Sequence, residues 1–179
     1  MNLELKILDC GSGIDKIPGA IRLDNNAKVN PDIIHDLNVV PYPFENNYFN
    51  KIYLNNILFQ LDDVFLTMKE VHRILKDDSN LIISCAYFRS SYAYHFPGSK
   101  NHFTANTFNF FNPDHIFYKK FKYSETKFKL EKIVFNENFK SGFLKKLIIL
   151  IANNYPNFYE NNLSQIFPLD EIKYHLKKI

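Results

Sequence analysis

The chain has 179 residues, of which 46% are hydrophobic and 23% are charged, and its formal net charge is +3. These values are typical of a globular domain and exclude a disordered tail or a coiled coil as the main architecture. No apolar run approaches the roughly 20 residues of a membrane-spanning helix, and the first residues lack the pattern of a signal peptide. We therefore expect a single domain over residues 1–179, located in the cytoplasm and without a transmembrane segment.

Charge is distributed unevenly along the chain. Residues 1–90 carry 9 basic and 12 acidic side chains, whereas residues 91–179 carry 13 and 7. The basic half suggests an anionic partner, but only 3 of the 22 basic residues are arginine. Nucleic-acid binding relies on arginine for bidentate contacts. A solvated lysine-rich surface is the simpler interpretation, so we do not expect a nucleic-acid partner.

Only two cysteines occur, Cys10 and Cys85. Neither has a second cysteine or a histidine at the spacing of metal ligands, and two cysteines make no disulfide framework. We expect both to be small core residues, and we expect no metal site.

Short apolar segments separated by turn residues dominate the first half. They predict four strands, at residues 5–9, 20–24, 32–36 and 51–54. About ten residues separate the first two strands, which is too few for an ordinary crossover helix, so we expect a turn or loop there. This pattern is typical of a mostly parallel sheet covered by helices.

From Asp62 onward the apolar residues adopt helical spacing. Residues 64, 68, 71 and 75 predict a helix with its N-cap at Asp62 or Asp63. We expect residues 77–80 to break this helix before a buried strand at 81–86. Residues 87–115 are aromatic and irregular, which suits loops over the carboxyl ends of strands, where ligands of α/β proteins bind.

The carboxyl-terminal part predicts an antiparallel pair of strands. Residues 128–135 and 171–179 alternate or nearly alternate apolar and polar side chains, as half-buried strands do. Between them, apolar residues 144, 147, 148 and 151 indicate a helix that is too short to span a membrane. We expect this helix to pack on the sheet, with an amphipathic membrane anchor as the alternative.

The first strand is followed by a glycine loop, Leu8-Asp-Cys-Gly-Ser-Gly13. Its two glycines permit positive φ angles and a close approach of the backbone to a ligand, as in nucleotide-binding loops. A dinucleotide site would need a third glycine, where Lys16 stands, and a helix N-terminus for the pyrophosphate. Asp24 ends the next strand, and a carboxylate there can accept both hydroxyls of a ribose. The pattern favours a nucleoside ligand without phosphates.

Several segments together resemble the class I S-adenosylmethionine-dependent methyltransferases of the small type-11 group. They are the loop at 8–13, the acid Asp24, the pair Asp36-Leu37, the segment from Pro43-Phe44 to Phe49, and the helix end from Val71 to Lys76. The similarity covers residues 5–115. It implies an α/β Rossmann-like fold: a mostly parallel sheet with helices on both faces, an antiparallel edge hairpin and a shortened amino-terminal part.

The resemblance implies S-adenosylmethionine as the cofactor and assigns residues to it. The methionine part would face Asp9 and the backbone of Cys10, Gly11, Ser12 and Gly13; the ribose would face Asp24, with Asn25 in the same site; the adenine would face Asp36 and Leu37; and the sulfonium would lie near Asn55. Taken alone, Asp24 or Asp36 is better explained as a turn or cap aspartate. Their joint spacing favours a cofactor site.

The chain departs from the family at Phe59-Gln60, where a Glu-His pair is common, and at Asp77-Asp78-Ser79, where glycines are usual. Methyl transfer to a hydroxyl requires an aligned acceptor and benefits from a base. His95 and His102 lie in the segment expected above the sulfonium. We rank His102 first because Lys100 to Thr104 resembles a family segment that returns toward the site. A structural or surface role is the alternative for either histidine.

We therefore predict a methyltransferase that modifies a hydroxyl of a small-molecule or saccharide acceptor in a bacterial pathway. Residues 87–115 and 142–166 are expected to form a substrate-side lid or insertion, and a homodimer is another way to cover the site. Two alternatives stay open. One is a catalytically silent cofactor-binding partner of another enzyme, and the other is a nucleic-acid methyltransferase that uses the basic second half.

Overall fold

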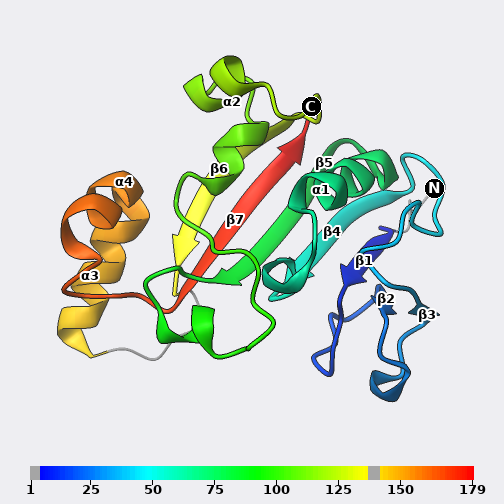
Figure 1. Cartoon of the computed structure of the whole chain (residues 1–179), viewed down its shortest axis with the longest axis horizontal. Coiled ribbons are helices and arrows are strands. Elements are labelled where there is room, and N and C mark those ends of the chain that lie inside the picture. Colours follow the sequence, from blue (N-terminus) through cyan, green and yellow to red (C-terminus); the bar gives the residue numbers. More distant parts are fainter. Residues whose placement is uncertain (1–4, 137–141) are drawn as a thin grey trace.

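The computed structural model describes residues 5–136 and 142–179, and its framework is a seven-stranded sheet (Figure 1). The strands are β1 (Ile7–Cys10), β2 (Ala20–Asp24), β3 (Ile33–Ile34), β4 (Phe49–Asn55), β5 (Leu75–Ala86), β6 (Phe128–Phe135) and β7 (Glu171–Lys178). They lie in the order β3-β2-β1-β4-β5-β7-β6. The first five pair in parallel, whereas β7 runs antiparallel to both β5 and β6. The predicted fold class, a mostly parallel sheet with an antiparallel edge pair, is confirmed.

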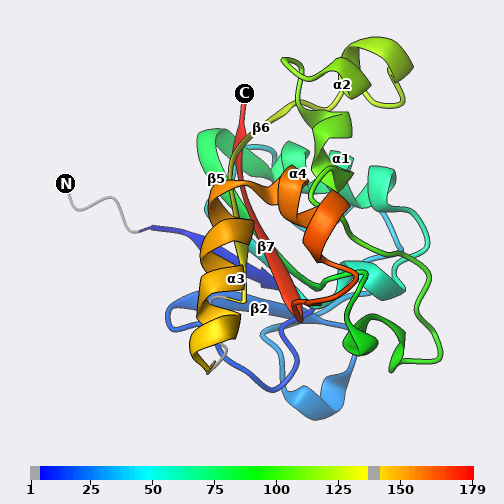
Figure 2. The ribbon, with the colours of Figure 1, turned by 90° about the vertical axis from the view of Figure 1, so that its left-hand side faces the viewer.

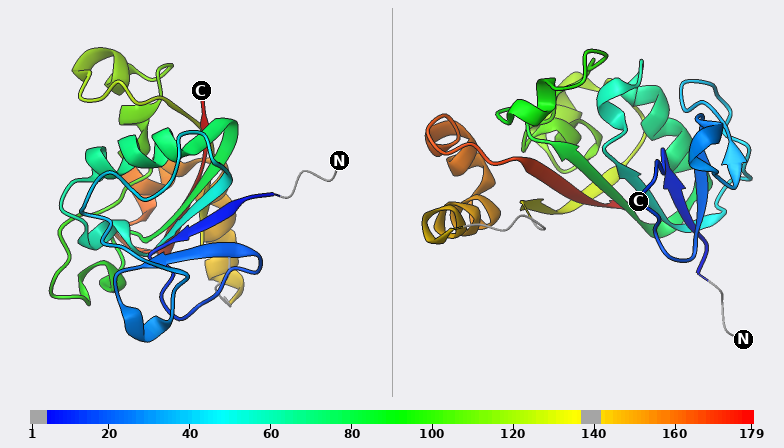
Figure 3. Two further views of the ribbon diagram at one scale, coloured as in Figure 1. Left: turned by 90° about the vertical axis from the view of Figure 1, so that its right-hand side faces the viewer. Right: turned by 90° about the horizontal axis from the view of Figure 1, so that it is seen from below.

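Helices cover the sheet unevenly. They are α1 (Val64–Ile74), α2 (Ile116–Phe121), α3 (Phe143–Asn154) and α4 (Pro156–Phe158), which continues into a π-helical turn at Tyr159–Leu163. Helices α1 and α2 lie on one face of the sheet, and α3 lies on the other side, beside β6 (Figures 2 and 3). Among the described residues, no helix is both long and apolar enough to cross a membrane.

The crossover helix α1 forms where the sequence predicts it. Its N-cap is Asp63, whose side chain accepts a hydrogen bond from the N–H of Leu66 at 3.0 Å. Met68 and Val71 project from one side of the helix and are fully buried against the sheet. Because this helix lies in the connection from β4 to β5, it allows the parallel pairing of these two central strands.

The prediction that residues 77–80 interrupt the chain between helix and strand was wrong. The helix ends at Ile74, and β5 begins at Leu75 without a loop. The pairing with β4 shifts between Phe49 and Lys51, so the polar residues of β5 form a bulge, in which Asp78 has a positive φ of 59°. Aspartate tolerates this conformation, and turn-type residues are therefore accommodated inside a strand.

Aromatic side chains fill the layer beside the sheet and join distant segments. Tyr87, which follows β5, packs edge-on against Phe135 of β6 with ring centroids 5.2 Å apart. Tyr159 packs edge-on against the same phenylalanine, also at 5.2 Å. The hydroxyl of Tyr174 on β7 donates to the carbonyl of Thr104 at 2.6 Å. These contacts anchor the loops of residues 87–111 and the helical turns of 156–163 on the antiparallel end of the sheet.

The connection between β1 and β2 contains no helix, as its length predicts. In place of a helix, Arg22 on β2 holds this connection. Its guanidinium donates to the carbonyl oxygens of Gly13 and Val29, both at 2.8 Å, and of Asn30 at 2.7 Å. Arg22 is only 6% exposed. One buried arginine thus fixes two loops at the carboxyl end of β2, a role for which the sequence carries no specific signal.

Candidate functional site

A polar cavity of about 330 Å³ lies where β1, β2 and β4 end. Its lining residues come from four successive turns of the chain between positions 11 and 61; they are Gly11, Gly13, Asp24, Asn25, His35, Asp36, Leu37, Asn38, Asn56, Ile57, Gln60 and Leu61. The carboxyl ends of parallel strands meet at one edge of the sheet, which brings these turns together. We refer to this hollow as the polar cavity.

The glycine loop reaches the polar cavity because two of its residues have positive φ. Gly11 has a φ of +67°, and a Cβ added there would lie 2.5 Å from Cγ1 of Ile57. Gly13 has a φ of +51°, and a Cβ there would meet nothing within 4 Å. Gly11 therefore provides close packing of the backbone on Ile57, whereas Gly13 turns the chain and leaves open space for a ligand.

Asp24 stabilises the same loop. Its Oδ2 accepts the N–H of Gly13 at 2.8 Å, and its Oδ1 accepts the N–H of Asn26 at 2.9 Å. Each carboxylate oxygen has a second lone pair, so Asp24 can bind two hydroxyls of a ligand while it holds the loop. The turn role and the binding role predicted as alternatives are compatible in this geometry.

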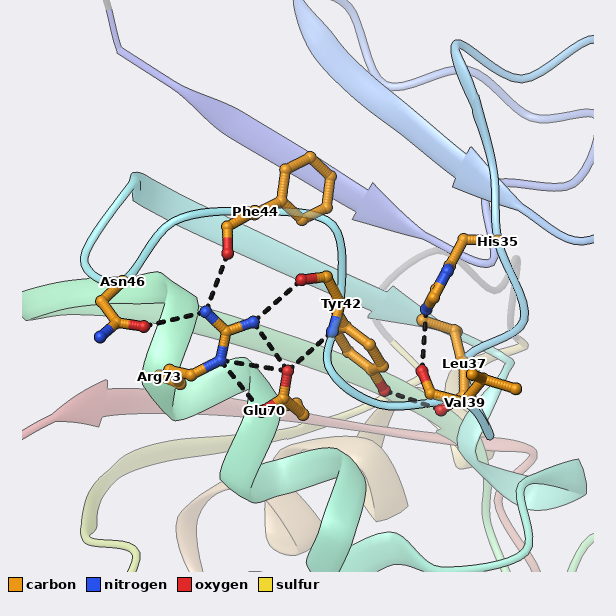
Figure 4. Close-up of polar contacts among 8 residues, drawn as sticks. All are labelled: His35, Leu37, Val39, Tyr42, Phe44, Asn46, Glu70 and Arg73. Atoms are coloured by element: carbon orange, nitrogen blue, oxygen red, sulfur yellow. Dashed lines mark hydrogen bonds and ion pairs between the residues drawn. The ribbon is translucent and has the colours of Figure 1, made fainter.

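Helix α1 supports the far wall of the polar cavity through Arg73 (Figure 4). Its guanidinium donates to the carbonyl oxygens of Tyr42 at 3.0 Å and Phe44 at 2.8 Å, and to the Glu70 carboxylate at 2.8 Å. Glu70 also accepts the N–H of Tyr42 at 2.8 Å, and the Tyr42 hydroxyl donates to the carbonyl of Leu37 at 2.9 Å. Burial raises the pKa of Glu70, but its hydrogen bonds with Arg73 and Tyr42 hold it below the ordinary value. Leu37 is thus positioned from the helix.

Asp36, the acid assigned to the adenine, has only one of its two carboxylate oxygens in hydrogen bonds. Oδ1 of Asp36 accepts the N–H of Asn38 at 2.9 Å and its amide Nδ2 at 3.2 Å. Within residues 5–136 and 142–179, Oδ2 of Asp36 has no hydrogen-bond partner, so it is available to an amino group. Asn38 also accepts the N–H of Asp62 at 2.9 Å, which ties this turn to the start of α1.

The charges of the polar cavity select the kind of ligand. Two carboxylates, Asp24 and Asp36, line it, and none of its described lining residues is lysine or arginine. Such a site favours a cationic or neutral ligand and disfavours a pyrophosphate. The buried hydroxyl of Ser12 in the glycine loop has no hydrogen-bond partner among the described residues. An orphaned buried polar atom in this loop fits a bound polar group.

Asp9 lies beneath the glycine loop at the end of β1 and is only 2% exposed. Burial raises its pKa to about 6; Arg22 acts to lower this value, and Asp24 acts to raise it. A carboxyl group with such a pKa gains a proton in mildly acidic solution and loses it near neutrality. The protonation of the Asp9 carboxyl group is therefore sensitive to the charge of a ligand bound at the glycine loop.

A second cavity of about 380 Å³ adjoins the polar cavity at Asn56. Its lining comes from widely separated parts of the chain: Asn56, Phe59, Ala86, Tyr92, Ala93, His95, Phe96, Asn101, Asp170 and Glu171. Asn56 follows β4 with a positive φ of 49°, and its N–H donates to the carbonyl of Ser84 at 2.8 Å. We call this hollow the adjacent cavity.

The departure from the family at Phe59-Gln60 falls at the boundary of the two cavities. Both residues belong to a short 3-10 helix at Leu58–Gln60. Gln60 lines the polar cavity and Phe59 lines the adjacent cavity, where its ring packs edge-on against Phe96 at 5.6 Å. An aromatic side chain thus replaces a charged one on the side of the adjacent cavity.

The two candidate histidines lie in different hollows. His95 lines the adjacent cavity, with its ring 4.9 Å from that of Tyr92. His102 packs against Tyr94 at 4.8 Å and lines a third cavity of about 510 Å³, the aromatic cavity, which also contains Phe65, Phe110 and Tyr123. Of the two, the geometry brings His95 to the hollow next to the polar cavity, although His102 had been ranked first.

The predicted cofactor residues divide into two groups. Six of them line the polar cavity: Gly11, Gly13, Asp24, Asn25, Asp36 and Leu37. The other four do not line it: Asp9, Cys10, Ser12 and Asn55. Cys10 is fully buried, and burial raises the pKa of its thiol, so it remains a neutral core side chain. Within residues 5–136 and 142–179, no cluster of three metal-ligating side chains occurs.

Five lining residues were not predicted from the sequence: His35, Asn38, Asn56, Ile57 and Leu61. A sixth, Gln60, was noted from the sequence as part of the departure from the family at Phe59-Gln60. For Asn56 a signal existed, because it follows the strand end at Asn55 and asparagine tolerates positive φ. The Asp36-Leu37 pair likewise predicts that its neighbours His35 and Asn38 lie close to the ligand. Ile57 and Leu61 face the cavity only through the 3-10 turn, for which the sequence carries no specific signal.

Comparison with known proteins agrees with this geometry. A family model described as a methyltransferase domain matches residues 11–83, the part of the chain that contains the whole polar cavity. No curated protein sequence is significantly similar to the chain. The predicted resemblance to class I methyltransferases of the type-11 group is confirmed, and the match supports S-adenosylmethionine as the cofactor.

Solved structures resemble the whole chain in fold. An S-adenosylmethionine-dependent methyltransferase from Archaeoglobus fulgidus has a TM-score of 0.60 and 16% identity, covering 97% of this chain and 86% of that one. One from Mesorhizobium loti has a TM-score of 0.60 and 14% identity, covering 97% and 91%. A Haloferax volcanii methyltransferase, in complex with the Trm112 activator, has a TM-score of 0.60 and 11% identity, covering 98% and 83%. At these identities the likeness shows the fold alone.

Proposed function

We propose that this chain, whose residues 11–83 match a methyltransferase domain family, binds S-adenosylmethionine in the polar cavity and methylates a hydroxyl of an acceptor in the adjacent cavity. The observation that carries the proposal is the junction of the two cavities at Asn56. A cofactor in one hollow and an acceptor in the other would meet at that residue, which is the arrangement that an in-line transfer needs.

The residues that line the polar cavity, together with two buried residues of the glycine loop, suit this cofactor. Asp24 would hold the ribose hydroxyls, and Asp36 would accept the adenine amino group beside Leu37. The carboxyl group of Asp9 would favour the cationic methionine end above it, and the unpaired hydroxyl of Ser12 would hydrogen-bond its polar groups. When bound, S-adenosylmethionine supplies the methyl group, whose bond to sulfur breaks as its bond to the acceptor oxygen forms.

The adjacent cavity suits a small hydroxylated acceptor such as a saccharide. Aromatic rings of Phe59, Tyr92 and Phe96 offer flat apolar surfaces, and Asp170, Glu171 and Asn101 offer polar atoms for hydroxyl groups. His95 would take the proton of the reacting hydroxyl. The lysine-rich part of the chain does not line this cavity, which argues for a small molecule over a nucleic acid.

Calorimetry with S-adenosylmethionine and its demethylated product tests the cofactor assignment. We expect Asp24→Ala to weaken binding by about 1–3 kcal/mol, the scale of hydrogen bonds to a charged group. Asp15→Ala is the matched control, because Asp15 is exposed in the same loop. Absence of binding to the native protein, or equal binding of NAD, would contradict the assignment.

The acceptor assignment needs a separate measurement. We would follow transfer of a labelled methyl group to a panel of saccharides and small hydroxylated compounds, with single-stranded RNA and DNA as further arms. Product on a small hydroxylated compound supports the proposal. Product on nucleic acid, with an affinity that falls steeply with salt, would assign the reaction to the alternative class. Cofactor binding without any product would leave the chain as a silent cofactor-binding partner.

A further inference from the structure

An apolar surface on the outer side of α3 has no counterpart in the proposed function. Phe143, Leu147 and Leu150 recur at intervals of four and three residues, so they share one side of the helix. Phe143 is 87% exposed and Leu150 is 60% exposed. On the inner side, Ile148 and Ala152 are buried against the rest of the protein. Among the described elements, none lies over the outer side of α3 (Figure 2).

The surface continues from the helix onto a later segment. Ile166 is 71% exposed, and Phe167 beside it is also exposed. With Leu144, Ile148 and Leu169 they line a groove of about 340 Å³ between α3 and residues 166–169. We call the outer side of α3 together with this groove the α3 surface. Exposed apolar side chains gathered on one surface mark a site of contact with a membrane, a protein or a ligand.

Helix α3 carries two basic residues, and one of them, Lys145, pairs with Asp170. Residues 142–159 contain Lys145 and Lys146 but no aspartate or glutamate. Lys146 is exposed. The neighbouring strand β6 contacts α3 through a hydrogen bond from the N–H of Phe135 to Asn153 at 2.6 Å. This strand exposes two lysines, Lys129 and Lys132, and one acid, Glu131. An apolar helix side flanked by lysines complements an anionic lipid bilayer, which has an apolar interior and negatively charged headgroups.

We propose that the α3 surface docks on an anionic lipid bilayer, with α3 lying in the interface parallel to the membrane plane. The apolar side chains of Phe143, Leu147 and Leu150 would enter the acyl boundary, and Lys146 would meet the headgroups. The aromatic residues Tyr155 and Phe158, which are exposed at the end of the helix, suit the headgroup level. The helix lies on the membrane and does not cross it.

A second copy of the chain is a less suitable occupant of this surface. A two-fold contact places the same patch against itself. The lysines of both copies would then meet in a contact to which residues 142–159 contribute no acidic side chain. An anionic bilayer supplies the missing negative charge.

The docked helix is connected to the proposed acceptor site. Lys145 of α3 forms an ion pair with Asp170 at 2.6 Å, and Asp170 lines the adjacent cavity. Leu169 lines the groove, so the two hollows lie on consecutive residues. Docking would hold the adjacent cavity close to the bilayer and give it acceptors that are attached to lipids. This consequence rests on the proposed function, whereas vesicle binding itself does not.

Tryptophan fluorescence gives a direct test, because the chain contains no tryptophan. Leu147→Trp places one on the α3 surface, and Ile116→Trp places one at the start of α2, where Ile116 is 62% exposed. With vesicles of equimolar phosphatidylglycerol and phosphatidylcholine, we expect a blue shift of emission for Leu147→Trp only. Pure phosphatidylcholine vesicles should give a much smaller shift, and salt should weaken the effect.

Co-sedimentation with the same vesicles provides the second measurement. Phe143→Glu should lower binding of the full chain by about tenfold, since it removes apolar contact and adds a repelled charge. Ile116→Glu should bind as the native protein does, and thermal unfolding should show that both variants fold. The proposal is overturned if the native protein stays in the supernatant, or if Phe143→Glu binds equally well. It is also overturned if Phe143→Glu disrupts a lipid-independent dimer, which would assign the surface to a second copy.

Discussion

The polar cavity and the adjacent cavity share Asn56 but are built in different ways. The polar cavity is lined by residues between positions 11 and 61, and its walls are backbone turns held by short-range hydrogen bonds such as that from Gly13 to Asp24 at 2.8 Å. The adjacent cavity combines residues from three separate segments, 56–59, 86–101 and 170–171. The first can therefore be identified from local sequence, whereas the second depends on the tertiary fold.

Because the two cavities are built differently, we expect them to differ in how freely their ligands can vary. Backbone turns have little freedom to change without loss of the fold, so the polar cavity suits a ligand that does not vary. Side chains such as Phe59 and Phe96 can change while the strands behind them stay in place. We infer that the adjacent cavity determines which acceptor is used, and most of its lining residues lie outside the family match over residues 11–83.

The largest effect is expected from removing the proposed base. His95→Ala should lower turnover by about two to four powers of ten, because the reacting hydroxyl would lose its proton acceptor. Affinity for S-adenosylmethionine should stay nearly unchanged, since His95 does not line the polar cavity. The measurements are turnover with an acceptor found in the methyl-transfer screen, and calorimetry with the cofactor.

His102→Ala is the matched control for this prediction. His102 lines the aromatic cavity, so its replacement should leave turnover close to the native value. The opposite result, with His102 essential and His95 dispensable, would move the acceptor to the aromatic cavity. It would also show that the polar cavity and the adjacent cavity do not form one active site.

A smaller effect is expected at the backbone of the polar cavity, where the two glycines form a matched pair. In Gly11→Ala the new Cβ would lie 2.5 Å from Ile57 Cγ1 at a φ of +67°, so we expect a loss of about 2–4 kcal/mol in the free energy of unfolding. Gly13→Ala meets no atom within 4 Å and should cost about 1 kcal/mol, from φ alone. Denaturant unfolding measures both, and equal losses would contradict the close packing at Gly11.

Residue patterns predict the parts of this molecule that depend on neighbours in the chain. The bounds of β2 and β6 agree with the predicted strands, and Asp63 caps α1 as expected. The glycine loop and Asp24 were identified because their interaction spans only 11 residues, and both line the polar cavity. Periodicity and turn chemistry are local properties, so they indicate such features reliably.

Features that depend on distant segments were not predictable in the same way. Asp77 and Asp78 are turn-type residues, yet pairing with β4 keeps them inside a bulged strand. Arg22 gives no signal in the sequence, because its three carbonyl partners lie in loops whose positions follow from the fold. The choice between His95 and His102 likewise depends on which loop faces Asn56. Tertiary packing overrides local preference in each case.

The smallest expected effect concerns the pH dependence of cofactor binding through Asp9. Burial raises the pKa of this carboxyl group to about 6, so in the free protein it is mostly protonated below that pH and mostly ionised above it. Its contribution to the stability of the free protein is fully present below the unfolded-state pKa. That contribution is lost as pH rises through about 6.

Binding of the cationic methionine end above Asp9 would favour the ionised carboxylate and lower its pKa. Affinity for S-adenosylmethionine should therefore rise by about tenfold between pH 5 and pH 7, with a proton released on binding below pH 6. Calorimetry in buffers with different ionisation enthalpies measures both quantities. In Asp9→Asn the rise and the released proton should disappear, while Asp15→Ala should keep them. An affinity of the native protein that does not change with pH would show that Asp9 does not sense the ligand, and would restrict the cofactor contacts to the residues that line the polar cavity.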